Sequence, residues 1–415
     1  MNDSLHTSKR KLLNDPVYGF ITIPDELIFD LIQHPWFQRL RRITQLGLTN
    51  LVYGGAQHTR FQHAIGAMHL MTKAIEVIRS KGHPISGEEA LGVQIAILLH
   101  DIGHGPYSHT LENSLVTEIS HEQISLLIME QINQELGGKL DIAISIFKNE
   151  YPKKYLNQLV SSQLDMDRLD YLRRDSFFTG VSEGVIGVER IIKMLNVVDD
   201  ELLIEAKGIY SIEKFIVARR LMYWQVYLHK TVIAAEQMLV NILRRARELA
   251  EAGEELFGSA PLRHFLYHSW KIDDFRKNPE MIATFAQLDD YDIFGAIKVW
   301  AHHEDRVLSQ LCQSLVDRKL LKIKMQNSPF SESEIQEAKD KTLQSSNLSP
   351  DEVSYFVFSD SIYNRAYQSE MTGINLLFKD GTKQDIAQAA DLLNISALSK
   401  PVTKFFLCYP SGHSI

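Results

Sequence analysis

Cysteine is nearly missing from this sequence: its 415 residues hold two, Cys312 and Cys408. The two lie far apart, form no Cys-x-x-Cys motif and can make at most one disulfide. This excludes a disulfide framework and a closed zinc site built on several thiolates. It fits a reducing compartment, so we expect a cytoplasmic protein.

Long apolar runs and an excess of basic charge are also missing. The longest apolar run, ALGVQIAILL at 90–99, is about half a membrane span and contains Gln94. The polar N-terminus lacks the apolar core of a signal peptide. A net charge of −8 and a pI of about 6.1 give no broad attraction for nucleic acid or an anionic membrane. We therefore expect a soluble protein without a membrane partner; nucleic acid is disfavoured, although a local basic channel stays open.

What is present is helical periodicity, which dominates to about residue 320. Expected helices flank Pro35, the second ending at Gly47, and continue at 63–82, 86–103, 121–136, 153–173, 187–195, 211–252, 261–270, 279–287, 291–299 and 304–319. Ser86 and Glu89 have capping-box spacing. One short hairpin is expected, turning at Asp199–Asp200.

The texture changes after residue 320. Expected strands lie at 320–325, 354–359, 374–379 and 403–408, with helices at 331–344 and 384–393. The sequence predicts a mainly α protein in three parts: an N-terminal segment with helices that pack on the core (1–50), a helical catalytic domain (51–320) and a small C-terminal α+β domain (321–415).

Histidine is concentrated near the N-terminus, where ten of the sixteen fall within the first 121 residues. The stretch ILLHDIGHGPYSH follows an apolar run. His100 and His104 are four residues apart and share a face of any helix that continues through them. A lone histidine on an apolar face is usually a hydrogen-bonded core residue, but Asp101 beside His100 would be costly to bury unpaired. A divalent metal bound by the carboxylate and neutral imidazoles removes that cost.

Further ligands must come from elsewhere in the chain. The segment HTRFQHAIGAMH offers His58, His63 and His69, and QLDMDRLDYLRRD offers Asp165, Asp167, Asp170 and Asp175. A solvated acidic face is the alternative for the second segment, but its aspartates alternate with leucine and methionine, so some carboxylates must point inward. Mixed histidine and aspartate ligation suits Mn, Fe, Ni, Zn or Mg and activates water for hydrolysis.

The order of several motifs resembles one family. NDPVYGFI, FQRLRRITQLG, HTRFQHAIG, LLHDIGHGPYSH, HEQIS and DMDRLDYLRRD follow one another as in the HD-domain metal-dependent phosphohydrolases. The similarity is to their deoxynucleoside triphosphate triphosphohydrolase branch, which includes animal dNTPases with a sterile alpha motif. It covers about residues 10–235 and does not include that motif.

The resemblance implies a role for each matching residue. Four match metal ligands: His63, His100, Asp101 and Asp167. Two match a catalytic pair: His104 and Glu112, the latter replacing the aspartate of the animal enzymes. Seven match substrate-binding positions: Gln45, Arg60, His109, His121, Arg168, Tyr171 and Asp175. Tyr171 and Asp175 match the deoxyribose wall, whose tight fit excludes a 2′-hydroxyl.

A regulatory nucleotide site between subunits is also implied, in part. Lys11, Arg39 and Arg41 match basic residues of that site, whereas Gln33 stands where the animal enzymes have an aspartate that reads guanine. The alternative for these arginines is a solvated helix face. The resemblance and the large helical faces lead us to expect a homo-oligomer, a dimer or tetramer.

The leading hypothesis is a hydrolase that converts a deoxynucleoside triphosphate to deoxynucleoside and inorganic triphosphate with a divalent metal ion. Two alternatives stay open: an HD phosphohydrolase acting on another nucleotide phosphate, and a non-catalytic, metal-dependent nucleotide sensor.

Overall fold

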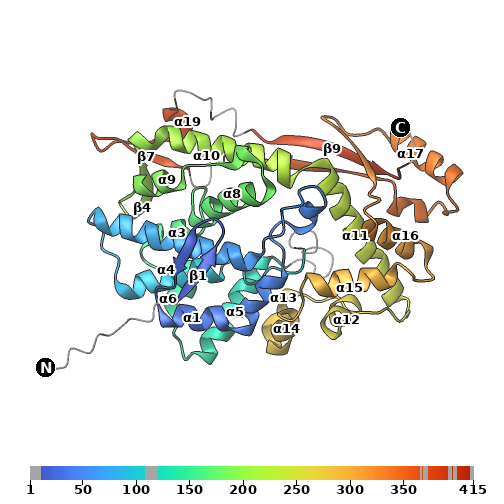
Figure 1. The fold of residues 1–415 in the computed structure, drawn as a ribbon, viewed down its shortest axis with the longest axis horizontal. Helices are drawn as coiled ribbons and strands as arrows, with labels where there is room; N and C mark the ends of the chain where they lie inside the picture. The colour runs from blue at the N-terminus through green and yellow to red at the C-terminus, as the bar shows by residue number, and fades with distance from the viewer. Residues whose placement is uncertain are drawn as a thin grey trace.

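Three helices form the centre of the fold. The computed structural model describes residues 11–107, 119–364, 367, 373–390, 395 and 400–411. Helix α3 (Arg60–Ser80) packs between α4 (Gly87–Leu99) and α8 (Met166–Thr179), as Figure 1 shows. α4 is buried along almost its whole length because its sequence is apolar on every side. Ser86 accepts from the Glu89 amide at 3.1 Å, and the Glu89 carboxylate accepts from the Ser86 amide at 2.8 Å, so the expected capping box is confirmed.

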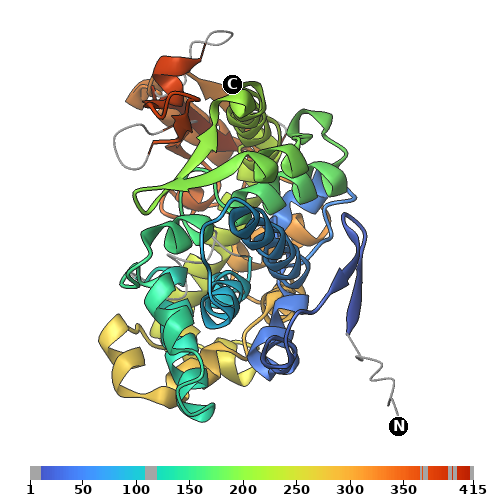
Figure 2. The ribbon, with the colours of Figure 1, turned by 90° about the vertical axis from the view of Figure 1, so that its left-hand side faces the viewer.

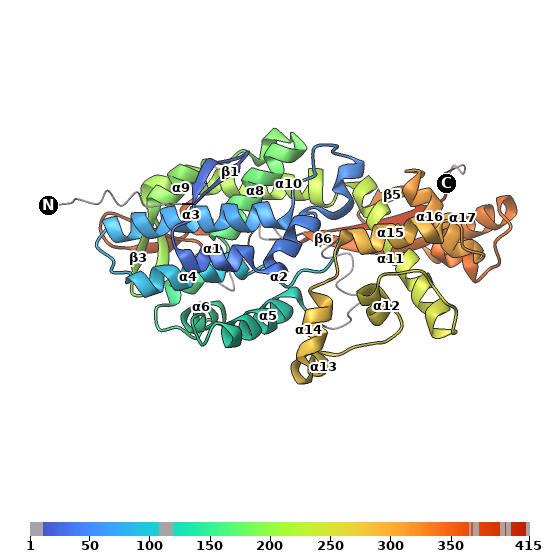
Figure 3. The same cartoon turned by 60° about the horizontal axis from the view of Figure 1, so that its bottom comes forward.

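The other helices surround this centre. Before residue 229 they are α1 Glu26–Gln33, α2 Pro35–Gln38, α5 His121–Glu135, α6 Asp141–Phe147, α7 Lys154–Val160, α9 Val188–Met194 and α10 Ile209–Met222. Beyond it they are α11 Lys230–Glu251, α12 Ala260–Leu266, α13 Ile272–Lys277, α14 Pro279–Phe285, α15 Asp290–Trp300, α16 Arg306–Val316, α17 Glu332–Ser345 and α19 Ile386–Ala389. Figure 3 shows α13 and α14 at the edge of the molecule, with α14 against α5.

Short 3-10 and π turns join several of these helices. The 3-10 turns are η1 Arg39–Arg42, η2 Gly47–Leu51, η4 Ser182–Gly184, η5 Ala206–Gly208 and η7 Glu352–Tyr355, and Tyr223–Tyr227 forms a π-helical turn, η6. The π turn leads from α10 into the connection before α11.

The strands form three small sheets. They are β1 Leu12–Asp15, β2 Gly19–Thr22, β3 Leu195–Val198, β4 Glu201–Glu205, β5 Lys322–Gln326, β6 Phe358–Asn364, β7 Asn375–Leu377, β8 Lys383–Asp385 and β9 Val402–Tyr409. The sheet orders are β1-β2, β3-β4-β7-β8 and β5-β9-β6. In Figure 2 the β1–β2 hairpin lies along the outside of the helical core. The predicted hairpin at Asp199–Asp200 is confirmed, with both residues at positive φ. The mainly α fold is confirmed as well.

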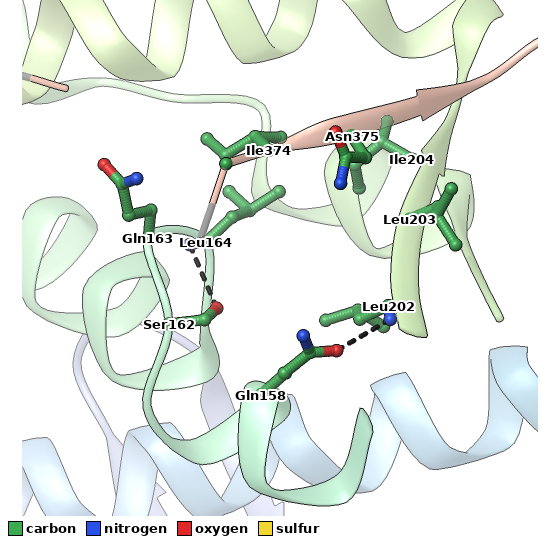
Figure 4. A pocket seen from close by; sticks show the side chains of 10 residues that line it. Gln158, Ser162, Gln163, Leu164, Leu202, Leu203, Ile204, Ile374 and Asn375 are labelled. Carbon is green, nitrogen blue, oxygen red and sulfur yellow. Dashed lines mark hydrogen bonds between the residues drawn. The ribbon is translucent and has the colours of Figure 1, made fainter. Parts of the chain in front are cut away.

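Strands from both sides of residue 320 share one sheet. β4 pairs in parallel with β7, and Ile204 lies opposite Leu376. Beside this seam is a cavity of about 30 Å³ between the α7–α8 connection and β4 (Figure 4). There the Gln158 side-chain oxygen accepts from the Leu202 amide at 2.7 Å. The cavity has room for about one water molecule and not for a substrate.

Two predicted long helices are interrupted. The helix expected at 153–173 breaks between α7 and α8, because Asp165 accepts from the Arg168 amide at 2.7 Å and starts a new helix. The helix expected at 211–252 passes through η6 and restarts where the His229 ring accepts from the Thr231 amide. α6, α13 and the β1–β2 hairpin were not predicted.

The predicted end of the second N-terminal helix, at Gly47, was also wrong. α2 stops at Gln38 and continues as η1, and Gly47 begins η2 at a φ of +50°. Thr44 bridges to Thr59, and its amide donates to Asp290 at 2.8 Å, which draws this backbone out of a helical path. Within the described residues no helix has both the length and the apolarity needed to cross a bilayer.

Candidate active site

The four predicted metal ligands come together from three places in the fold. His63 lies on α3, His100 and Asp101 follow the last turn of α4, and Asp167 lies in the first turn of α8. His63 Nε2 is 3.1 Å from Asp167 Oδ1 and 3.8 Å from Asp101 Oδ2. His100 Nε2 is 3.2 Å from Asp101 Oδ1 and 3.5 Å from Asp167 Oδ1. Two imidazoles and two carboxylates therefore face one point.

These donors fit a divalent metal. The Nε2 atoms of His63 and His100 are buried, and neither forms a hydrogen bond of acceptable geometry with the residues that the structure describes. A buried ring nitrogen without a hydrogen bond is costly. Binding of one cation by both nitrogens and by oxygens of Asp101 and Asp167 satisfies all four groups with hard N and O ligands.

The opposite ring nitrogen of each histidine is already held. His63 Nδ1 is 2.8 Å from Asp170 Oδ2, and His100 Nδ1 is 2.6 Å from the Ile97 carbonyl. An N–H that donates to these oxygens leaves Nε2 as the lone-pair nitrogen, which is the form that binds a metal. The Ser125 hydroxyl donates to the His100 carbonyl at 2.7 Å and holds the backbone there.

A buried ion-pair chain supports Asp170. Arg174 donates to Asp170 at 2.9 Å and to Asp15 in the β1–β2 hairpin at 2.8 Å. Gly66 on α3 leaves space for this pair, since a Cβ there would lie 2.1 Å from Asp170 Oδ1 and 2.2 Å from a terminal guanidinium nitrogen of Arg174. The N-terminal hairpin is thus tied to the metal-ligand cluster.

Opposite charges balance one another in the metal-free cluster. Burial alone would lower the pKa of His63, but Asp167 and Asp170 raise the pKa to about 10. Burial would raise the pKa of Asp101, but His100, His104 and Arg60 hold it well below its ordinary value. A bound cation would replace the histidine charge in this balance.

A cavity of about 460 Å³ opens from this cluster. Nine residues predicted from the sequence line it: Gln45, Arg60, Asp101, His104, His121, Asp167, Arg168, Tyr171 and Asp175. His63 and His100 lie behind the wall. The volume falls in the range of about 300–1,000 Å³ typical of small-molecule sites.

Basic and imidazole groups lie beside the carboxylates. Arg60 donates a hydrogen bond to Asp101, and His104 Nε2 lies 3.3 Å from Asp101 Oδ1. The His104 ring stacks on His121, with centroids 3.8 Å apart. Arg168 donates to the Ser162 carbonyl at 2.6 Å, which directs its side chain along the wall. This end of the cavity suits an anionic ligand.

The other predicted wall is aromatic. Tyr171 contacts Tyr227 edge-on, at a centroid distance of 6.2 Å. Asp175 accepts from the Tyr227 hydroxyl at 2.7 Å and lies 2.8 Å from His58 Nε2. Asp175, which itself lines the cavity, therefore holds the tyrosine wall in place.

Several candidates lie elsewhere. His69 contacts Tyr18, and Asp165 caps α8. Of the predicted regulatory residues, Lys11 lies over the Phe29 ring and Arg41 over the Phe61 ring. His109 and Glu112 lie outside the described residues.

Arg39 is buried, contrary to a place on a solvated face. It donates to the carbonyls of Leu288 at 2.6 Å, Ile102 at 3.1 Å and His104 at 2.6 Å. Its guanidinium is therefore committed to the backbone and not presented to a nucleotide at the surface.

Three residues that were not predicted from the sequence also line the cavity: Tyr223, Tyr227 and Glu236. The two tyrosines are four apart in YWQVY, but this spacing resembles an ordinary helical core. Glu236 is one of three acidic residues in a long amphipathic helix, and no sequence pattern distinguishes it from the other two.

The comparisons agree with this geometry. Residues 60–175 match the HD domain model and residues 186–257 match the HD associated region. Uncharacterized protein YwfO of Bacillus subtilis is 32% identical, over 97% of this chain and 93% of that one. The Dictyostelium discoideum deoxynucleoside triphosphate triphosphohydrolase SAMHD1 homolog is 31% identical, over 61% of this chain and 53% of that one.

A solved structure covers nearly the whole chain. A phosphohydrolase from Bacteroides thetaiotaomicron superimposes with a TM-score of 0.93 at 55% identity, over 97% of this chain and 100% of that one. The chain therefore belongs to the HD-domain family and is a metal-dependent phosphohydrolase, of the branch that resembles the deoxynucleoside triphosphate triphosphohydrolases.

Proposed function

We propose that this phosphohydrolase acts on deoxynucleoside triphosphates and releases deoxynucleoside and inorganic triphosphate. One observation carries the proposal: a single cavity joins the metal-ligand cluster, a group of basic and imidazole side chains, and a tyrosine wall. These three parts of the cavity suit a ligand that has a reacting phosphate, an anionic tail and an uncharged nucleoside. The similarity to the Dictyostelium enzyme supports the same substrate class.

His63, His100, Asp101 and Asp167 would hold the metal, which when bound supplies Lewis acidity and a nucleophilic water for attack on the α-phosphorus. The bond from that phosphorus to the 5′ oxygen breaks, the nucleoside takes up a proton, and triphosphate leaves.

The chain's own residues orient the substrate. Arg60, Arg168 and His121 neutralise the triphosphate, and His104 lies at the α-phosphate beside Asp101. Gln45 contacts the sugar 3′-hydroxyl, and Tyr171 and Asp175 close the wall at the sugar 2′ position. His109 and Glu112 complete the predicted set.

The decisive experiment identifies the phosphorus product. Purified protein is incubated with each dNTP and each NTP plus Mn or Mg, and the products are separated by anion-exchange chromatography. Triphosphate from dNTPs supports the proposal. Pyrophosphate or monophosphate would assign the site to another nucleotide reaction, and binding without turnover would assign a sensor.

A matched pair of variants ties turnover to the cluster. His100→Ala should abolish product, whereas His83→Ala, which removes a histidine bonded to Asn196 away from the cavity, should leave it unchanged. Activity in His100→Ala equal to that of the wild type would contradict the proposed metal site.

We also propose that the protein forms a homo-oligomer. The β1–β2 hairpin exposes 58% of Leu12 and 73% of Phe20, and we infer that a second copy of the chain covers these two side chains. A double Leu12→Ser, Phe20→Ser variant should lower the mass measured by light scattering, and a monomeric wild type would contradict this.

A further inference from the structure

Glu236 brings an unpartnered carboxyl into the wall of the substrate cavity. It lies on α11 and lines the cavity together with Leu46, Gly47 and Leu228. No described residue forms a hydrogen bond or an ion pair with its carboxyl. The side chain is partly buried, so its carboxyl faces the cavity and is free to bond a ligand there.

No charged side chain among the residues that the structure describes acts on the Glu236 carboxyl. α11 packs against η2, and a Cβ on Gly47 would lie 3.7 Å from Glu236 Oε1 and 3.8 Å from the Tyr107 carbonyl. Burial raises the pKa of Glu236 to about 8, and no charged side chain contributes to the shift. Burial thus favours the protonated carboxyl, which offers one donor beside one acceptor.

Gln45 is a second polar side chain in this wall that awaits a partner. Its Oε1 is buried and accepts no hydrogen bond from the residues that the structure describes. Its backbone amide donates to the His58 carbonyl at 3.0 Å, so the side chain is held at the cavity while its oxygen stays unsatisfied. Two unsatisfied polar groups in one wall indicate a ligand that carries its own hydrogen-bonding groups.

The anionic part of a nucleotide does not suit Glu236. Phosphate oxygens only accept hydrogen bonds and need cations, which the cavity lining supplies at Arg60 and Arg168. The part of a dNTP that presents a donor beside an acceptor on one planar edge is the nucleobase, as in the amino group and ring nitrogen of adenine or cytosine.

We propose that Glu236 is a specificity-determining residue that hydrogen-bonds the edge of the substrate's nucleobase. This inference rests on the proposed dNTP function and assigns the base end of the same cavity. Glu236 is then a binding group, and the reacting phosphate lies away from it.

The test removes each partner of that hydrogen bond in turn. Wild type, Glu236→Ala and Glu236→Gln are compared with dATP and with purine 2′-deoxyriboside triphosphate, which lacks the exocyclic amino group. Glu236→Ala should raise KM for dATP about tenfold at little change in kcat, the size of one lost hydrogen bond. Glu236→Gln keeps a donor and an acceptor and should stay within about threefold of wild type. With the analogue, Glu236→Ala should raise KM by a smaller factor than with dATP, because only the hydrogen bond to the ring nitrogen is left to lose.

Each other outcome overturns the proposal. An equal loss with dATP and the analogue would show that Glu236 does not contact the base edge. A loss that vanishes only with the dideoxy form of dATP would assign Glu236 to the sugar 3′-hydroxyl. Failure of the wild type to release triphosphate from any dNTP would overturn the proposed function itself.

Two controls separate recognition from folding. Glu251→Ala changes an exposed acid on the same helix and should leave all kinetic constants unchanged. If Glu236→Ala does not fold by circular dichroism, Glu236→Leu gives the same comparison with a side chain of similar size.

Discussion

Asp170 lies 2.8 Å from Nδ1 of His63, on the side of the ring opposite the metal-ligand cluster. This contact orients the ring and sets which nitrogen carries the proton, so Asp170 acts through His63. Replacing Asp170 by asparagine should weaken metal binding by roughly 10- to 100-fold, the usual effect of losing such a partner. Isothermal titration calorimetry of the metal-free protein with Mn measures the metal affinity. Asp25→Asn, at an exposed helix cap where asparagine serves equally well, is the control; equal affinities in the two variants would refute the role of Asp170.

Metal binding should stabilise the folded protein. A ligand at a hundred times its Kd adds about 2.7 kcal/mol when it binds only the native state. Mn should therefore raise the Tm of the wild type in differential scanning fluorimetry, and EDTA should reverse the rise. Asp101→Asn removes the negative charge from one of the four facing ligands, so Mn should raise its Tm by less than that of the wild type. A response equal to that of the wild type would count against Asp101 as a ligand.

Gly66 is predicted to tolerate no side chain. A methyl group there would meet both Asp170 and Arg174 at about half of a normal contact distance. Gly66→Ala should therefore destabilise the protein by at least about 1–3 kcal/mol, the usual cost of overpacking a core. Gly295→Ala, inside α15 with no heavy atom within 4 Å of the added Cβ, should be neutral or stabilising by up to about 1 kcal/mol. Equal midpoints in urea for the two variants would contradict the close packing.

Glu89 gives a pH dependence of known sign. Burial would raise the pKa of Glu89, but Lys153 and the Ser86 amide lower it below its ordinary value of 4.5. A carboxyl whose pKa is lower in the folded protein stabilises it above the unfolded pKa. That stability is lost as the pH falls through the folded pKa. The difference in unfolding free energy between wild type and Glu89→Gln should be constant near neutral pH and shrink below pH 4.5. A difference that grows in acid would reverse the assignment.

Tyr171 is expected to select deoxyribose. Removing its ring from the wall should admit a 2′-hydroxyl, so the ratio of kcat/KM for dATP over ATP should fall about tenfold or more in Tyr171→Ala. Tyr210→Ala, which changes a tyrosine 55% exposed to solvent, is the matched control. An unchanged ratio in Tyr171→Ala would place the sugar elsewhere.

The metal-ligand cluster was predictable because its residues are unusual in their setting. His100 and Asp101 directly follow an apolar run, and Asp167 lies in a segment where aspartates alternate with leucine and methionine, so burial and charge conflict unless a metal is present. Glu236 carries no such conflict in the sequence, since a single acid on an amphipathic helix normally faces water. Only packing of α11 against η2 turns it into the cavity.

Interruptions of helices were the less predictable part of the fold. The adjacent sequence alone allows Asp165 to be a metal ligand, a surface charge or a helix cap. The structure makes it a cap, with its second oxygen accepting from the Ser162 amide at 2.8 Å. Arg39 likewise belongs to a basic run that is typical of a surface. In the structure it is buried and donates to three carbonyls that lie far from it in the sequence. Both outcomes depend on contacts far apart in the chain, which a local pattern does not contain.

The three carbonyls held by Arg39 bear on where this enzyme can be cut. Two of them belong to the turn that carries His104, and the third precedes α15. A truncation starting after residue 50 would leave these acceptors without their donor and release the turn that holds the imidazole. The N-terminal segment that carries Arg39 therefore stabilises the turn that holds His104. A minimal functional fragment has to retain this segment.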